Sequence, residues 1–247
     1  MRLGIAFREL KYDLNLAKVY FLGKIQGFEK DYFMCQDQSG KIYWCSSSTW
    51  VFSELPNAPT SKKDVERLSQ INNIFTGEFD HILFESEGPS QVIDPVSGLE
   101  LKPKPVTELD RLSYVFHQIS NNFAIPKGFC KFIPSEKLVS NEAFKGLSKE
   151  QVGKLENWQF KRDPKNVEIK EMIARGEAVY NLNCLDSVAD DLPKSAWSIQ
   201  EDVTGTLATL KSHLWPGLYC YHRCNTNVSG FVYIGEGLKN VNLPFMI

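Results

Sequence analysis

One stretch in the carboxy-terminal third decides the fold class. Residues 196–235 read AWSIQEDVTGTLATLKSHLWPGLYCYHRCNTNVSGFVYIG. Aromatic and β-branched residues gather here in short runs that Gly and Pro separate, a composition typical of strands and turns. Connections this short cannot hold the crossover that parallel neighbours need, so we expect an antiparallel meander. Its predicted strands are Ala196–Gln200, Thr206–Trp215, Leu218–Cys224 and Phe231–Ile234.

The amino-terminal third shows the same strand character. Residues 18–25 and 31–36 are short, aromatic and β-branched, and Gly27 separates them. This pattern predicts a hairpin. Residues 41–52 predict a second strand pair that turns near 46–48.

Two helices are predicted from spacing and capping. Residues 60–72 carry apolar side chains at helical intervals behind a Thr-Ser start. Ser148 stands three residues before Gln151, which is the pattern of a capping box. We therefore predict helices over 60–72 and 148–158.

Two further segments complete the assignment. Asp163 and Pro164 supply an N-cap and a first-turn proline for a helix that ends before Gly176. Residues 110–132 fit either a helix or a hairpin turning at 120–122, and we predict the hairpin. The fold class is α+β, with antiparallel β-sheets and a few short helices.

The chain is predicted to form a single domain over 1–247. Residues of about 86–105 include four prolines, which remove hydrogen-bond donors and prevent regular structure. An irregular stretch of this length is uncommon inside a compact domain. It is expected to be either a surface loop or an arm that lies along a partner.

Composition excludes several classes of function. The 28 basic and 30 acidic side chains nearly balance, which argues against a nucleic-acid partner. No run approaches the length of roughly 18 apolar residues that a membrane-spanning helix needs, so no membrane partner is expected. The six cysteines are too sparse for a disulfide-built secreted scaffold and predict reduced thiols in the cytoplasm.

The strongest metal candidate is a cluster on one predicted strand. Cys220, His222 and Cys224 alternate along the chain and therefore face the same way. Alternate side chains on a strand lie roughly 6.6 Å apart, whereas two thiolates on one zinc ion lie at most about 4.6 Å apart. We interpret the cluster as one face of an ordinary strand and predict no metal site.

No other motif predicts chemistry. The acidic cluster of Asp186, Asp190 and Asp191 lacks the ligand spacing of a calcium loop and is interpreted as a solvated turn. Gly235-Glu236-Gly237 has no third glycine and too little chain after it for a dinucleotide-binding unit. We predict no catalytic residue and no cofactor. The competing hypothesis is an enzyme that uses Cys220 or His222.

The apolar end of the chain is the remaining feature. Residues 243–247 read LPFMI, and chain ends fray unless they are docked. This pentapeptide is expected either to pack on its own sheet or to form part of an interface, where aromatic and Met residues are enriched. The candidate assembly residues are Trp215, Leu243, Pro244, Phe245 and Met246.

Several blocks in one order carry a resemblance to a known family. They are Leu192-Pro193-Lys194, Trp197–Gln200, Leu214–Leu218, Gly230–Gly235, Lys239-Asn240 and Leu243–Met246. With these blocks the chain resembles the radial spoke head protein 9 family of motile cilia and flagella. Further matches lie upstream in Phe144–Ser148, Ile125–Gly128 and Tyr20–Ile25.

The chain departs from the family at three places, one of which is the middle loop, where no residue roles are transferred. Leu22 stands where relatives commonly have Trp, and the helical stretch that precedes the hairpin in longer members is expected to be missing. Contacts made by that stretch are therefore not transferred.

The resemblance implies a structural, non-catalytic subunit of the radial spoke head in the axoneme. Its implied partners are other radial spoke head proteins, those of the 4/6 type included, and the central pair through the assembled head. Its implied role is to relay mechanical signals that regulate the dynein arms. The alternative is a cytoplasmic adaptor unrelated to cilia.

Overall fold

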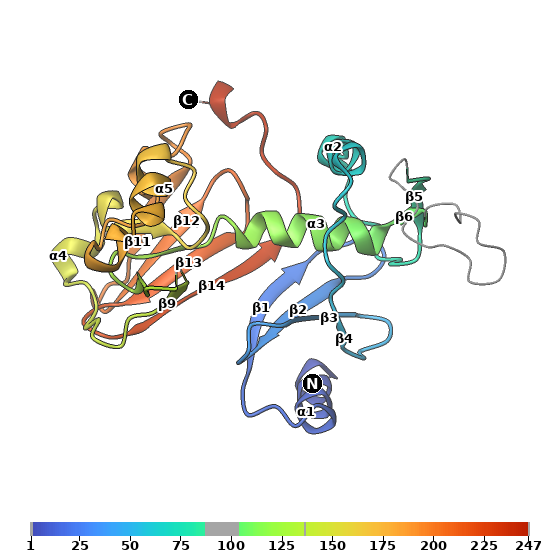
Figure 1. Cartoon of the computed structure of the whole chain (residues 1–247). Helices are drawn as coiled ribbons and strands as arrows, with labels where there is room; N and C mark the ends of the chain where they lie inside the picture. The colour runs from blue at the N-terminus through green and yellow to red at the C-terminus, as the bar shows by residue number, and fades with distance from the viewer. Residues whose placement is uncertain (1, 87–103, 136, 247) are drawn as a thin grey trace. The chain divides into compact units, whose positions relative to one another are not determined.

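The computed structural model describes residues 2–86, 104–135 and 137–246 (Figure 1). Its contacts group the chain into two compact units. Unit 1 comprises Met1–Gln118 and Tyr233–Leu238, and unit 2 comprises Ile119–Val232 and Lys239–Ile247. That the chain forms a single domain stays a prediction. Most of the proline-rich loop predicted over about 86–105 lies outside the described residues.

The sheet of unit 1 confirms the predicted hairpin. Strands β1 (Val19–Ile25) and β2 (Tyr32–Asp37) pair in antiparallel fashion, and β3 (Ile42–Ser46) continues the sheet. The partner of β3 is the two-residue strand β4 (Ser53–Glu54), which begins just beyond the predicted range. On its other side β1 runs parallel to the end of β14 (Val228–Gly235).

Helices of unit 1 bring one confirmation and one correction. Helix α2 (Lys62–Gln70) lies inside the predicted range of 60–72. Helix α1 (Arg2–Asp13) precedes the hairpin, so the expectation that a helical stretch is missing there is wrong. Its Leu10 packs on Cys35 and Tyr43, which explains why this polar segment is helical. The short strands β5 (Ile82–Phe84) and β6 (Val106–Thr107) pair with each other.

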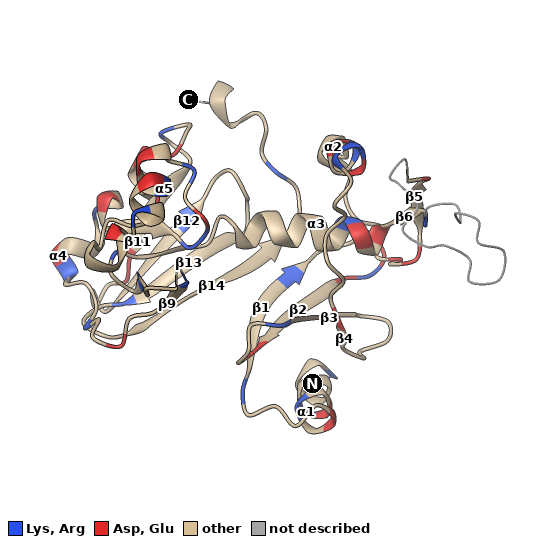
Figure 2. Cartoon of the chain, viewed as in Figure 1, with Lys and Arg blue, Asp and Glu red and all other residues tan. Residues whose placement is uncertain are grey.

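The hairpin predicted for 110–132 is wrong in its first half. Helix α3 spans Glu108–Ser120, followed by β7 (Ala124–Pro126) and β8 (Cys130–Phe132). Figure 2 shows the acidic first turn of α3, where Glu108 and Asp110 oppose the positive end of the helix dipole. Its apolar side chains are buried at helical rather than alternate spacing, namely Leu112, Val115, Phe116 and Ile119.

Unit 2 contains the predicted meander. Strands β11 (Trp197–Glu201), β12 (Leu207–Ser212) and β13 (Leu218–Arg223) follow one another as antiparallel neighbours, and β14 lies next to β13. Short pairs complete the unit. In these, β7 pairs with β10 (Trp158–Phe160), and β8 pairs with β9 (Leu138–Ser140).

Both helices predicted in unit 2 exist, but their bounds differ. Helix α4 (Lys149–Val152) starts at the predicted capping box and ends early, because Gly153 and the 3₁₀ turn η1 (Leu155–Asn157) follow it. Helix α5 (Val167–Ala174) ends before Gly176 as predicted. Its N-cap is Asn166 rather than Asp163. The Asn166 side chain accepts a hydrogen bond from the Glu168 amide at 2.9 Å.

Candidate interaction surface

A single asparagine anchors the carboxy-terminal segment to unit 2. The Asn240 amide donates to the Leu214 carbonyl at 2.8 Å, and its side-chain Nδ2 donates to the His213 carbonyl at 3.4 Å. Its Oδ1 accepts the Asn242 amide at 3.2 Å, which turns the chain into the 3₁₀ turn η4 (Leu243–Phe245). Asn240 belongs to the Lys239-Asn240 block noted in the sequence, but its anchoring role was not predicted, although an Asn two residues before an Asn-Leu-Pro step is a turn signal.

The tail itself divides into a buried and an exposed part. Leu243 is only 7% exposed, whereas Phe245 is 88% and Met246 72% exposed. Pro244 is also exposed, and Ile247 lies outside the described residues. A large aromatic ring and a Met side chain thus lie in solvent on a backbone that is tied down. Such side chains are enriched at protein interfaces.

Trp215 lies next to the anchor point but inside the protein. It is 5% exposed, and its amide donates to Ser212 Oγ at 3.1 Å. The Leu218 amide closes a turn on the Trp215 carbonyl at 2.9 Å, with Gly217 at φ 100° as a type II turn requires. Trp215 is thus almost fully buried, and its part in assembly stays a prediction.

Cys220 and His222 lie on the buried face of β13, and the buried Cys224 follows directly after the strand. His222 Nε2 accepts the Leu147 amide at 3.1 Å, and its Nδ1 lies 3.1 Å from the Val228 carbonyl. The first hydrogen bond requires that Nε2 carry no proton. Nδ1 is therefore protonated, and its N–H donates a hydrogen bond to the Val228 carbonyl. Burial lowers the pKa of His222, which favours this neutral form.

The thiol of Cys220 is engaged in the same way. Its Sγ accepts the Ala124 amide at 3.3 Å, and burial raises the pKa of the thiol to about 12. A thiol with so high a pKa is a poor nucleophile at neutral pH. Among the residues that the structure describes, no three or more His, Cys, Asp or Glu side chains are placed to hold a metal ion.

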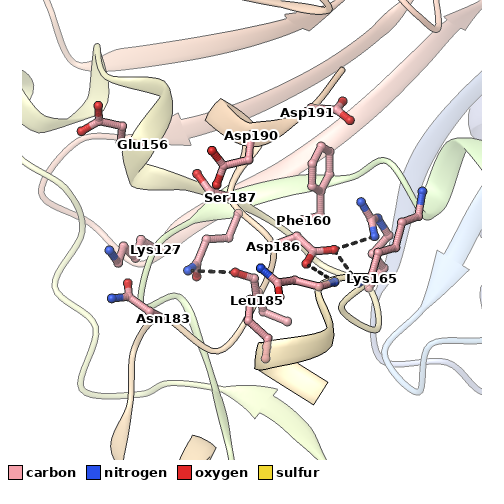
Figure 3. Close-up of a pocket in the computed structure, with 14 residues that line it drawn as sticks. Lys127, Glu156, Phe160, Lys165, Asn183, Leu185, Asp186, Ser187, Asp190 and Asp191 are labelled. Atoms are coloured by element: carbon pink, nitrogen blue, oxygen red, sulfur yellow. Dashed lines mark hydrogen bonds and ion pairs between the residues drawn. The ribbon is translucent and has the colours of Figure 1, made fainter. Parts of the chain in front are cut away.

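A polar pocket of about 510 Å³ in unit 2 contains the predicted acidic turn (Figure 3). The Asp186 carboxylate accepts hydrogen bonds from Arg162 at 2.8 Å and from the amides of Lys165 at 2.7 Å and Asn166 at 3.1 Å. Its side chain is 13% exposed, so the interpretation as a solvated turn is wrong for Asp186. Asp186 fixes the start of α5.

Two other polar groups of this pocket also hold local structure. The Asp191 carboxylate accepts the Trp197 indole N–H at 2.9 Å, and Ser187 Oγ accepts the Ala189 amide at 3.3 Å. Ser187 thus caps a short helical turn, and Asp191 links that turn to β11.

No membrane-spanning candidate is found among the described helices, all of which are too short or too polar.

Comparison with known proteins gives a consistent result. No family model matches the chain. The radial spoke head protein 9 homolog of Danio rerio is 32% identical over 250 residues, which covers 96% of this chain and 88% of the relative. The homolog of Homo sapiens is 32% identical over 252 residues with the same coverage, and that of Xenopus tropicalis is 26% identical. Identity at this level across nearly the full length of both chains shows that this chain belongs to the radial spoke head protein 9 family.

Proposed function

We propose that this chain is a structural, non-catalytic subunit of the radial spoke head in the axoneme of motile cilia or flagella. Membership in the family, across 96% of the chain, is the observation that carries the proposal. The buried, backbone-bonded Cys220 and His222 add support, because an enzyme would need such groups free and accessible. The proposed location is the axonemal cytoskeleton within the cytoplasm.

The proposed role is to support head assembly and to pass mechanical signals between the central pair and the dynein arms. A subunit that transmits force needs a stiff interior, and the closely packed interiors of proteins resist compression. In unit 2 this interior includes Trp158, Phe160 and Trp197, all buried, with ring centroids of the last two 5.8 Å apart. The proposed partners are other radial spoke head proteins, among them those of the 4/6 type.

The tail is the proposed assembly contact. Phe245 and Met246 project from a backbone that Asn240 fixes, so little conformational entropy remains to be lost when a partner covers them. Burial of an aromatic side chain removes about 150–250 Å² from water. Leu243 and Trp215 would support this contact from inside unit 2.

Co-purification from cells with motile cilia tests the proposal. Tagged full-length chain is compared with the double variant Phe245→Ser and Met246→Ser, and the other head proteins are quantified by mass spectrometry. We expect the wild-type chain to recover them and the double variant to lose most of them. Val203→Ser is the matched control, because Val203 is fully exposed in a loop of unit 2. Recovery of no head protein by the wild-type chain would overturn the proposed function, and equal recovery by all three chains would overturn the role of the tail.

A further inference from the structure

Unit 1 contains an apolar groove that the proposed tail contact does not use. It has a volume of about 670 Å³ and lies between helix α1 and the segment of residues 41–54. Val51 is 65% exposed and Leu14 48% exposed at its edges. The apolar side chains that line it are Ala6, Leu10 and Leu14 from α1 and its end, and Tyr43, Val51 and Phe52 opposite.

The charged side chains that line this groove are mostly acidic. Glu9 and Asp13 come from α1, and Glu54 comes from β4. The cation in the lining is Lys41, which already pairs with Glu54 at 3.3 Å. Within the described part of the chain, Glu9 and Asp13 are in no ion pair. The groove therefore presents two uncompensated negative charges beside apolar surface.

The stability of α1 does not explain these two acids. Glu9 and Asp13 are four residues apart, and like charges at this spacing repel each other on a helix. Asp13 is also the last residue of α1, where the helix dipole disfavours negative charge. Both acids thus oppose the local structure that carries them, which points to a role outside the helix.

Trp50 adds an independent sign of function at the same groove. It lines the groove with φ at 57°, a left-handed conformation that is rare for a bulky residue. Its ring stacks on Phe33 with centroids 5.2 Å apart, and its indole N–H is buried without a hydrogen-bond partner in the described residues. Strained backbone of this kind gathers at binding and switch sites.

We propose that this groove binds a segment of a partner polypeptide in which apolar side chains are flanked by Lys or Arg. The apolar side chains would cover Leu14, Val51 and Phe52, and the cations would pair with Glu9 and Asp13. The proposal rests on the proposed function, since it names a second docking site of an assembly subunit. Its test uses the isolated chain, so its failure is distinguishable from a failure to co-purify with head proteins.

Titration with a defined peptide tests the groove. The probe is an acetylated peptide of sequence KKLFLKK, and its binding to the full chain is followed by calorimetry and by the emission of Trp50, with Trp50→Phe to assign that signal. Saturable binding is expected, with at least a tenfold loss of affinity for Glu9→Lys combined with Asp13→Lys. Val51→Ser changes no charge and should also weaken binding.

The controls separate a specific groove from bulk charge. Glu29→Lys combined with Glu66→Lys changes the charge equally, at two exposed positions outside the groove, and should leave affinity within twofold. The peptide KKSGSKK keeps the cations without the apolar residues and should bind at least tenfold more weakly. The proposal is overturned if KKLFLKK does not saturate, if KKSGSKK binds equally well, or if Glu29→Lys with Glu66→Lys weakens binding as much as Glu9→Lys with Asp13→Lys.

Discussion

Replacement of the buried Glu108 by Gln should strongly destabilise unit 1. The carboxylate is 1% exposed and accepts four hydrogen bonds. Oε1 accepts the Tyr32 hydroxyl at 2.7 Å and the Gly77 amide at 2.8 Å. Oε2 accepts the amide of Thr76 at 2.9 Å and its hydroxyl at 2.8 Å. Glu108 thereby ties α3 to β2 and to the loop before β5.

The magnitude follows from the hydrogen bonds that Gln cannot make. A Gln side chain has one carbonyl oxygen and one NH₂ group, so one backbone amide would face a donor, the hydroxyl beside it would have to turn to accept, and every remaining bond would lose its charged acceptor. Hydrogen bonds to a charged group contribute about 1.5–3 kcal/mol each, so the variant should lose about 3–6 kcal/mol of unfolding free energy. For a chain of this size that lowers the melting temperature by roughly 6–24 °C.

Urea and thermal unfolding followed by circular dichroism measure this loss. Tyr32→Phe is the graded control, because it removes one donor and leaves the Gly77 amide on the same oxygen. It should cost about 1–3 kcal/mol. A Glu108→Gln protein within about 1 kcal/mol of wild type would refute the reasoning that this network stabilises the fold.

Three further outcomes are expected. Burial lowers the pKa of His222, so the imidazole binds a proton more readily in the unfolded chain than in the folded chain. The free energy of unfolding should therefore fall as the pH drops below about 6.5, by at most about 1.4 kcal/mol per pH unit. Comparison of pH-dependent melting should show this dependence abolished in His222→Gln and kept in the exposed control His117→Gln. Gly23→Ala should cost more than about 1 kcal/mol of unfolding free energy in urea, because the added Cβ would lie 2.0 Å from a carbonyl oxygen of β14 and the φ angle of Gly23 is 151°. The control is Gly4→Ala in helix α1, where the Cβ meets no atom within 4 Å, and it should stabilise the chain by about 0.5–1 kcal/mol. Equal effects of the two substitutions would contradict this prediction. Asp186→Asn should cost about 1–3 kcal/mol and expose the start of α5 to hydrogen exchange, and unchanged protection there would argue against its role as an anchor.

The predictable parts of the fold are those that neighbouring residues determine. The β1–β2 hairpin and the β11–β14 meander follow from strand-like composition and connections too short for a crossover. The capping box at Ser148 is likewise local, and the Ser148 amide donates to Gln151 at 3.1 Å. The blocks that resemble the radial spoke head protein 9 family are local too, because each is a short run of consecutive residues.

The incorrect predictions concern segments whose conformation depends on residues that are distant in sequence. The apolar side chains of residues 110–120 fit both helical and strand spacing. The helix is stabilised by the hydrogen bonds of Glu108, whose partner Tyr32 is 76 residues away in sequence. Asp186 binds the amides of Lys165 and Asn166 from some 20 residues downstream, which moves the start of α5 away from Asp163. No local pattern reports such contacts.

The candidate site is predictable only in part. Composition singles out the apolar tail, but it cannot show that Leu243 is buried while Phe245 is exposed. That difference depends on the bonds of Asn240 to residues 213–214, which lie far from it in sequence. Trp215 lies beside this anchor and is almost fully buried, and its part in assembly stays a prediction.

Quantitative composition of isolated axonemes tests the central claim most directly. The amount of this chain is compared by mass spectrometry between normal axonemes and axonemes that lack radial spoke heads. If the chain is a structural subunit of the head, it should be present in fixed proportion to the other head proteins and be lost together with them. Retention of the chain at its normal level in axonemes without heads would contradict the account.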